Sequence, residues 1–152
     1  AQAIFAPNAN SYRRFREGSY APTAPLWGYN NRTTAIRIPA GPGKARRIEH
    51  RVAGADANVH LATAAVLAGI HYGLTQRLDP GPPVEGNGYI AAAEPLPRGW
   101  SEALGVFDGS RFITDYFGPR FKKLYSAVRN AERRRFEAVV TPTELDWYLR
   151  AV

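Results

Sequence analysis

Hydrophobic and polar residues alternate along the segment from residue 33 to residue 52. Residues 33–39 are rich in β-branched side chains and end at a proline, Gly41-Pro42-Gly43 is typical of a turn, and residues 46–52 resume the alternation. This pattern predicts two antiparallel strands with a loose connection. The period of two puts alternate side chains of the second strand on opposite faces: Arg47, Glu49 and Arg51 on one, Arg46, Ile48 and His50 on the other.

The segments on either side of this strand pair show different patterns. Residues 1–31 are rich in Asn, Pro, Tyr and Gly and predict an irregular loop. After Gly54 the apolar period becomes helical, and we expect a helix with Asp56 as its N-cap that continues to about Leu78. Its apolar stripe should contain Val59, Ala62, Val66, Ile70 and Leu74.

The C-terminal half is predicted to be mainly helical. Residues 80–99 contain five prolines and four glycines, which indicates a surface excursion. Three helices should follow: one capped by Ser101, one that ends near Tyr116, and a longer one opened by Gly118-Pro119 with Phe121, Leu124, Tyr125, Val128 and Phe136 inward. Residues 141–144 have capping-box spacing, which predicts a last helix. We therefore expect an α+β fold in which the strand pair is part of a larger sheet.

Charge is distributed unevenly along the 152 residues. Residues 1–51 carry nine Lys or Arg and two acidic residues, whereas the remaining 101 residues have eleven of each sign. Six of the cations and a single carboxylate, Glu49, fall between Arg32 and Arg51. Such a concentration predicts a site for phosphates, of either a nucleotide or a nucleic acid. One carboxylate flanked by two guanidinium groups suits a metal–nucleotide complex.

Composition excludes several classes. The chain could bury one ordinary core, so it is one domain or less. It has no cysteine, which rules out disulfides and thiolate metal sites and fits a cytoplasmic location. No segment is long and apolar enough to predict a signal peptide or membrane span. With no methionine and a start at Ala1-Gln2-Ala3, we expect a piece of a longer protein.

A series of motifs runs along nearly the whole chain. The motifs are Asn10-Ser11-Tyr12-Arg13-Arg14, Ala21-Pro22, Asn31-Arg32, Ile36-Arg37-Ile38-Pro39, Lys44-Ala45-Arg46-Arg47-Ile48-Glu49, Gly54-Ala55-Asp56-Ala57-Asn58, Leu78-Asp79-Pro80-Gly81-Pro82-Pro83 and Tyr148. In this order they resemble the C-terminal part of the catalytic domain of glutamine synthetases, and they are most similar to the γ-glutamylpolyamine synthetase branch.

This resemblance implies an ATP-dependent carbon–nitrogen ligase. Family members phosphorylate the side-chain carboxylate of glutamate with ATP and a divalent ion, Mg²⁺ or Mn²⁺, and then let ammonia or a small amine displace the phosphate. It also implies a homo-oligomeric ring for the full-length protein. The upstream half of the catalytic domain, with further metal ligands, and the N-terminal domain are absent here, so residues 1–152 alone should be inactive.

The resemblance also implies roles for individual residues. By this resemblance, Arg14 and Arg51 bind the carboxylates of glutamate, and Glu49 binds the metal ion. Arg32 contacts the transferred phosphoryl group. The residues that bind ATP are Arg32, Arg37, Lys44 and Arg47. Guanidinium groups bind phosphate and carboxylate bidentately, and hard cations prefer oxygen ligands. The segment from Arg37 to Lys44 is one residue shorter than in bacterial glutamine-forming members, so the position of Lys44 differs from their pattern.

Tyr20 is the other departure from the family pattern. Glutamine-forming members carry at this position a glutamate, on a mobile flap, that helps to bind and deprotonate ammonium. A tyrosine cannot act as that base near neutral pH. Its ring can pack on a larger amine or face an ammonium group by cation–π attraction, worth about 0.5–2 kcal/mol. We therefore expect an acceptor amine other than ammonia.

Simpler interpretations remain for each of these features. Any single arginine is most often a solvated surface charge, and Glu49 alone is an ordinary cross-strand ion-pair partner.

His60 and His71 lie about 16 Å apart along a helix, too far to share one ion. Tyr89 falls where some bacterial members carry a regulatory tyrosine, but its surroundings differ. The alternative function is a non-catalytic paralogue or a basic nucleic-acid-binding or assembly module, for which Arg133-Arg134-Arg135 is a candidate contact; we do not favour it.

Overall fold

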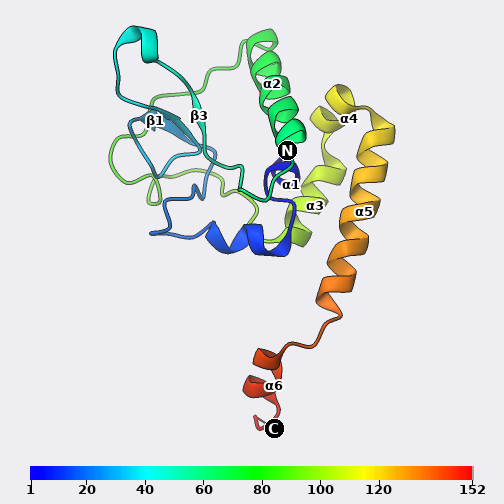
Figure 1. Cartoon of the computed structure of the whole chain (residues 1–152). Helices are drawn as coiled ribbons and strands as arrows, with labels where there is room; N and C mark the ends of the chain where they lie inside the picture. Colours follow the sequence, from blue (N-terminus) through cyan, green and yellow to red (C-terminus); the bar gives the residue numbers. More distant parts are fainter. Residues whose placement is uncertain (152) are drawn as a thin grey trace.

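A small sheet, flanked by helices, forms the N-terminal half, and a chain of helices forms the rest (Figure 1). The computed structural model describes residues 1–151. In order, the elements are α1 (Gln2–Phe5), the 3₁₀ helix η1 (Ala9–Arg14), β1 (Trp27–Tyr29), β2 (Ile36–Ile38), the 3₁₀ helix η2 (Gly43–Ala45), β3 (Glu49–His50), α2 (Val59–Thr75), α3 (Trp100–Gly109), α4 (Arg111–Phe117), α5 (Pro119–Glu137) and α6 (Pro142–Tyr148). The predicted α+β class is confirmed.

The sheet has three strands in the order β1-β2-β3. The predicted antiparallel pair is present as β2 and β3, with Arg37 opposite Glu49. Strand β1 runs parallel to β2 with Trp27 opposite Ile36, and this strand was not predicted. Three residues are too few to show a period of two, so β1 left no pattern in the sequence.

The prediction of a loop over residues 1–31 was wrong. Helix α1 is fully buried, with Ile4 and Ala3 each 1% exposed, and it packs against α2 and α3. The Tyr125 hydroxyl on α5 donates to the Ala3 carbonyl at 2.8 Å. Proline and asparagine are common here because the chain winds through short turns, yet the apolar residues between them form the centre of the core.

Helix α2 begins later and ends earlier than the sequence predicted. Asn58, not Asp56, is the N-cap, and its side-chain oxygen accepts from the amides of His60 and Leu61. The predicted apolar stripe is only partly buried: Ala62 and Val66 pack against the core, whereas Val59 and Leu74 are 68% and 76% exposed. Within residues 1–151, no element covers the two ends of this stripe, so helical period alone overestimated its burial.

The C-terminal helices follow the predicted order. Ser101 lies inside α3, whose N-cap is Gly99, so the predicted cap was wrong by two residues. Pro119 opens α5 as expected, but of its five predicted inward residues only Phe121 and Tyr125 pack against the core. Leu124, Val128 and Phe136 are exposed.

Helix α6 is separated from the rest of the molecule (Figure 1). Its predicted capping box is confirmed, because the Thr141 hydroxyl accepts from the Glu144 amide and the Glu144 carboxylate accepts from the Thr141 amide. Among the described residues, no helix combines the length and apolar character that crossing a lipid bilayer would require.

Candidate functional site

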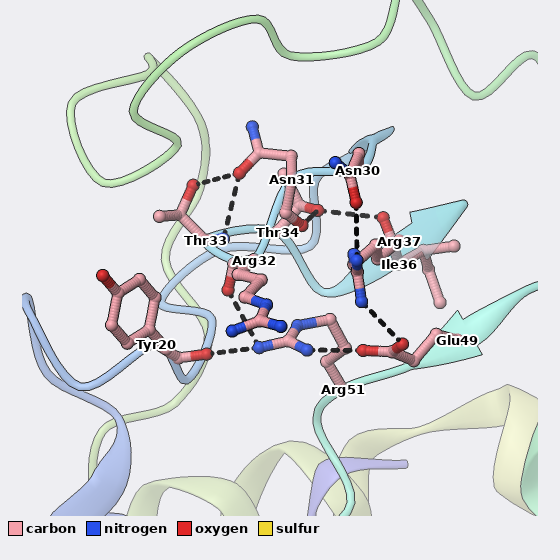
Figure 2. A network of polar contacts seen from close by, with 10 residues as sticks. All are labelled: Tyr20, Asn30, Asn31, Arg32, Thr33, Thr34, Ile36, Arg37, Glu49 and Arg51. Atoms are coloured by element: carbon pink, nitrogen blue, oxygen red, sulfur yellow. Dashed lines mark hydrogen bonds and ion pairs between the residues drawn. The ribbon is translucent and has the colours of Figure 1, made fainter. Parts of the chain in front are cut away.

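The Glu49 carboxylate is the centre of a partly buried ion-pair network (Figure 2). Its Oε2 accepts from Nη1 of Arg37 at 3.0 Å, and its Oε1 accepts from Nη1 of Arg51 at 2.5 Å. The first pair follows from strand register, since Arg37 and Glu49 are directly opposite on β2 and β3. The second follows from the period of two, which places Glu49 and Arg51 on the same face, as the sequence predicted.

Arg51 joins three segments of the chain. Besides Glu49 on β3, its guanidinium donates from Nη2 to the carbonyl oxygen of Tyr20 at 2.7 Å and to that of Arg32 at 3.0 Å. Figure 2 shows both carbonyls directed at the guanidinium, whereas the Tyr20 ring points away from it. Arg51 thus fixes the Tyr20 turn and the segment before β2 relative to the sheet.

Arg37 is held in a similar way. Its Nη2 donates to the side-chain oxygen of Asn30 at 2.5 Å, and its side chain is only 15% exposed. The Nε atoms of Arg37, Arg51 and Arg14 are buried, and each lacks a hydrogen-bond acceptor in the part of the chain that is described. Hydrogen bonds hold the guanidinium groups of Arg37 and Arg51 in place, and guanidinium groups fixed in this way are suited to bind anions.

The network lowers the pKa of the Glu49 carboxyl below its ordinary value of 4.5. The hydrogen bond from Arg51 is the main cause; burial opposes it, and the charge of Arg37 adds to it. Glu49 is ionised at neutral pH as a result. On the opposite face of β3, His50 packs on the Phe5 ring at 4.3 Å between centroids, and burial lowers its pKa, which favours the neutral imidazole.

Arg14 lies at the end of η1, close to the same network. Its Nη2 donates to the Val52 carbonyl, its guanidinium lies 4.8 Å from the centre of the Phe15 ring, and burial lowers its pKa. A cavity of about 380 Å³ opens beside it, lined by Arg14, Ser19, Tyr20, Ala21, Glu49, His50, Arg51 and Ala53. The structure thus brings together the predicted glutamate, metal and flap residues around one hollow.

Asp56 has a structural role beside this cavity. Its Oδ2 accepts from the Ser11 hydroxyl at 2.6 Å and from the Asn8 amide at 3.2 Å. Burial would raise the pKa of Asp56, but these hydrogen bonds and the nearby charge of Arg14 outweigh it and lower the pKa. The carboxylate therefore anchors the turn after β3 to η1, a role that the sequence did not indicate.

The other predicted cations are not held by the protein. Arg32, Lys44 and Arg47 have exposed side chains and make no ion pair or side-chain hydrogen bond among residues 1–151. Lys44 lies in η2 on the connection between β2 and β3, where Arg47 also lies. Arg32 precedes β2, Lys44 and Arg47 lie between β2 and β3, and within residues 1–151 none of the three side chains pairs with Glu49.

A second, larger hollow lies next to Arg32. Its volume is about 570 Å³, and it is lined by Tyr29, Asn30, Asn31, Arg32, Pro83, Val84, Glu85 and Gly86. The amide of Asn31 donates to the carbonyls of Val84 and Gly86, at 3.1 and 2.9 Å, and ties the proline-rich segment to the sheet. Sequence reasoning missed this contact, although the polar Asn30-Asn31 pair beside a strand was a signal for it. The Tyr89 hydroxyl in the same segment is buried.

The residues fit one ligand of a divalent metal ion but not a complete site. No group of three or more His, Cys, Asp or Glu side chains could hold a metal among the described residues. The Glu49 oxygens each accept one hydrogen bond and keep a lone pair, which suits Mg²⁺ or Mn²⁺ as an additional partner. The rest of such a coordination shell would have to come from outside this chain.

Comparison with known protein families gives a match over almost the entire chain. The family model described as "Glutamine synthetase, catalytic domain" matches residues 1–148. The chain belongs to the glutamine synthetase family. The predicted family is thereby confirmed, and the matched range includes Glu49 and the arginines around it.

Individual relatives agree with this family. Gamma-glutamylputrescine synthetase PuuA of Escherichia coli strain K12 is 47% identical over 150 residues, covering 99% of this chain and 32% of that protein. Type-1 glutamine synthetase 2 of Dictyostelium discoideum is 39% identical over 154 residues, covering 98% of this chain and 29% of the relative. The solved structure "Apo GmaS without ligand" superimposes with a TM-score of 0.84 and 27% identity, over 98% of this chain and 34% of that one. The chain spans about a third of the length of these relatives.

Proposed function

We propose that the chain is the C-terminal part of the catalytic domain of an ATP-dependent ligase that converts glutamate and an amine into a γ-glutamyl amide through γ-glutamyl phosphate. The observation that supports this most directly is the Arg37–Glu49–Arg51 network beside the Arg14 cavity. It combines fixed cations, an ionised carboxylate and a hollow large enough for a small amino acid. These are the requirements of phosphoryl transfer to a carboxylate.

We assign the substrate carboxylates and phosphates to the cations around this network. Arg14 and Arg51 would hold glutamate at the cavity, and Arg32 would contact the transferred phosphoryl group; the nucleotide phosphates would be held by Arg37, Lys44, Arg47 and Arg32. Arg51 retains one Nη1 hydrogen besides those that it donates to Glu49, Tyr20 and Arg32. It can therefore bind a carboxylate without releasing the protein groups.

Glu49 would be one ligand of Mg²⁺ or Mn²⁺ in this proposal. A divalent ion supplies charge neutralisation for the phosphates of ATP. Arg37 and Arg51 keep the Glu49 carboxylate ionised and oriented, because they lower its pKa and fix both oxygens. The carboxylate is thus preorganised and needs no reorientation when a cation binds.

The acceptor is proposed to be an amine larger than ammonia. Tyr20 lines the cavity, is 63% exposed, and has no carboxylate to replace the glutamate of glutamine-forming members. An aromatic ring at the entrance can pack on the methylene groups of an amine and attract its ammonium group. The relative named for putrescine is 47% identical to this chain, and the relative named as a type-1 glutamine synthetase is 39% identical. The higher identity to the former favours an amine larger than ammonia.

We also propose that the full-length protein is a cytoplasmic homo-oligomer, as the family resemblance implies for its ring. Support comes from the C-terminal segment, whose apolar side chains are exposed in the described chain: Val139, Val140, Leu145, Trp147, Tyr148 and Leu149. In this proposal another subunit covers these exposed apolar side chains.

An acceptor panel on the full-length protein tests the proposed function. Glutamate-dependent phosphate release from ATP is measured with ammonia, monoamines and diamines such as putrescine. We expect ligation with at least one amine at a higher kcat/KM than with ammonia, and none with residues 1–152 alone. If ammonia has the highest kcat/KM, the acceptor assignment fails; if no acceptor supports turnover, the ligase assignment fails.

Nucleic-acid binding remains the alternative outcome. Arg37 and Arg51 are already paired with Glu49 and are largely buried, which disfavours their contact with a long phosphate backbone. Electrophoretic mobility shift of DNA and RNA with the full-length protein, at several salt concentrations, is the direct measurement. Tight binding that weakens steeply with salt would support the alternative.

A further inference from the structure

The Tyr20 turn has a backbone conformation that needs external support. Tyr20 has a φ of 58°, in the left-handed region that residues with a Cβ rarely adopt. Its side chain makes no hydrogen bond among the described residues, and its ring is mostly exposed. The backbone beneath it therefore sets the direction in which the side chain leaves the turn beside the cavity.

Ser19 supplies much of that support. Its hydroxyl oxygen lies 2.5 Å from the carbonyl of Arg14 and 2.6 Å from that of Arg16, and it accepts from the amide of Ala21 at 3.2 Å. These contacts cross the turn on both sides of Tyr20. Arg51 completes the support by donating to the Tyr20 carbonyl at 2.7 Å.

The Ser19 hydroxyl also links the turn to the proposed glutamate site. The Arg14 carbonyl that it contacts belongs to the residue whose guanidinium lines the same cavity. A shift of the turn would move the Tyr20 ring relative to Arg14 and Arg51, while the sheet contacts of Arg37 and Glu49 would remain. The turn can thus change the acceptor side of the cavity separately from the phosphate side.

We propose that Ser19 is a positioning residue for acceptor specificity: its hydroxyl holds Tyr20 in the left-handed conformation that places the aromatic ring at the cavity where the amine binds. This inference rests on the proposed ligase function. Ser19 does not touch the reacting atoms; it acts through Tyr20. Loss of the Ser19 hydroxyl should therefore raise the KM of the amine more than the KM of glutamate or ATP.

Steady-state kinetics of Ser19→Ala, Ser19→Thr and Ser101→Ala in the full-length protein test the proposal. Ser19→Ala removes the hydroxyl, Ser19→Thr keeps it, and Ser101→Ala is a matched change on an exposed position of α3. For Ser19→Ala we expect the KM of the preferred amine to rise about tenfold, with the preference over ammonia falling by about the same factor. The KM values for glutamate and ATP should stay within about twofold, and Ser19→Thr and Ser101→Ala should resemble the wild type.

A purely structural role of Ser19 predicts a different result. In that case kcat would fall with all three KM values unchanged, or all three would rise together, and either pattern would overturn the proposal. Unchanged amine preference in Ser19→Ala would also overturn it. Failure of the proposed ligase function would give a different result, because the wild-type protein itself would then ligate no amine.

Tyr20→Gly provides a second test that does not depend on the folding of Ser19→Ala. Glycine adopts a positive φ freely, so this variant keeps the turn while removing the ring. We expect it to lose amine preference to a similar extent, and adding Ser19→Ala to it should change the preference no further, as in a double-mutant cycle of two coupled residues. Retained preference in Tyr20→Gly, or an additive effect of the second change, would contradict the inference.

Discussion

Arg37 and Arg51 differ from Lys44 and Arg47 in structure, although all four belong to one basic cluster in the sequence. The side chains of Arg37 and Arg51 are 15% and 17% exposed, and both donate to Glu49. Lys44 and Arg47 are exposed and make no polar side-chain contact in the described chain. The cluster is therefore two groups of cations, one fixed on strands and one on an exposed connection.

The backbone explains the difference. Arg37 is on a strand and Arg51 directly follows one, so pairing of β2 with β3 brings both guanidinium groups to the same carboxylate. The connection from Pro39 to Ile48 contains only the single turn of η2, because glycine and proline at positions 41–43 disfavour a longer helix or a strand. Charge density in the sequence predicts the presence of a site, and backbone pairing decides which of its charges are preorganised.

The ion pairs of α5 show a third arrangement. Arg129 pairs with Glu132 at 2.8 Å and Arg133 pairs with Glu137 at 2.5 Å, so each arginine has its own acid. Such pairs on one helix contribute about 0.3–0.5 kcal/mol and leave no excess charge. On the sheet, two arginines share one carboxylate, which leaves one positive charge held in place for an anionic ligand.

Among the proposed variants, Glu49→Gln should lose the most activity, because it removes the carboxylate that the two fixed cations share. The amide cannot balance two guanidinium charges or bind a divalent ion well, so we expect about a 10³-fold loss of kcat in the full-length protein, the size of effect seen when preorganised charge is removed from an active site. Glu137→Gln, which breaks the pair with Arg133 on α5, is the matched control and should stay within about twofold. Activity of Glu49→Gln within tenfold of wild type would remove Glu49 from the site.

Arg37→Ala and Arg47→Ala compare the two groups directly. Each removes one guanidinium, but only Arg37 is preorganised on the sheet, so we expect about a 100-fold loss of kcat/KM for ATP in Arg37→Ala. Arg47→Ala should lose less than about tenfold, because an exposed side chain must be ordered before it can help. Equal losses in the two variants would show that ATP binding orders the connection as fully as strand pairing orders Arg37.

The sequence predicted the site better than it predicted the core. The period of two was enough to place Glu49 beside Arg51 and to put His50 on the other face, and the structure confirms both. The pairing of Arg37 with Glu49 could not be predicted, because it depends on the strand register and the loose connection between the strands does not specify that register. The bond from Arg51 to the Tyr20 carbonyl joins residues 31 positions apart and has no local signal.

The errors in the fold have physical causes. Helical period identified α2 and α5, but it could not show which positions a neighbouring element covers, so Leu74 and Val128 were wrongly expected to be buried. Asp56 was expected to cap α2 because Asp is a good N-cap; hydrogen bonds from Ser11 and Asn8 engage it, and Asn58 caps the helix instead. The segment 1–31 appeared irregular because its elements are shorter than the periods that reveal them.

The salt dependence of the KM for ATP should distinguish the exposed cations, Lys44 and Arg47, from the fixed ones. Interactions of exposed charges are screened at physiological ionic strength more strongly than those of partly buried charges. We expect the KM for ATP of the wild-type protein to rise with added NaCl from 0.05 to 0.3 M, and the rise to be about threefold smaller in Lys44→Ala/Arg47→Ala. An unchanged salt dependence in that double variant would mean that the exposed cations do not approach ATP.

The dependence of stability on pH should give the smallest effect and test whether the Glu49 pairs exist in solution. The folded-state pKa of Glu49 lies below its ordinary value of 4.5, so its pairs stabilise the fold above that pH, and this contribution is lost as the pH falls through the folded-state pKa. We expect Glu49→Gln to lower the melting temperature by about 2 °C at pH 6 and by less at pH 4, measured on the full-length protein. Glu137→Gln, which removes an exposed pair, should change it by less than about 1 °C at pH 6. If Glu49→Gln lowered the melting temperature equally at both pH values, the effect would come from packing, and the distinction between fixed and exposed cations would lose its electrostatic basis.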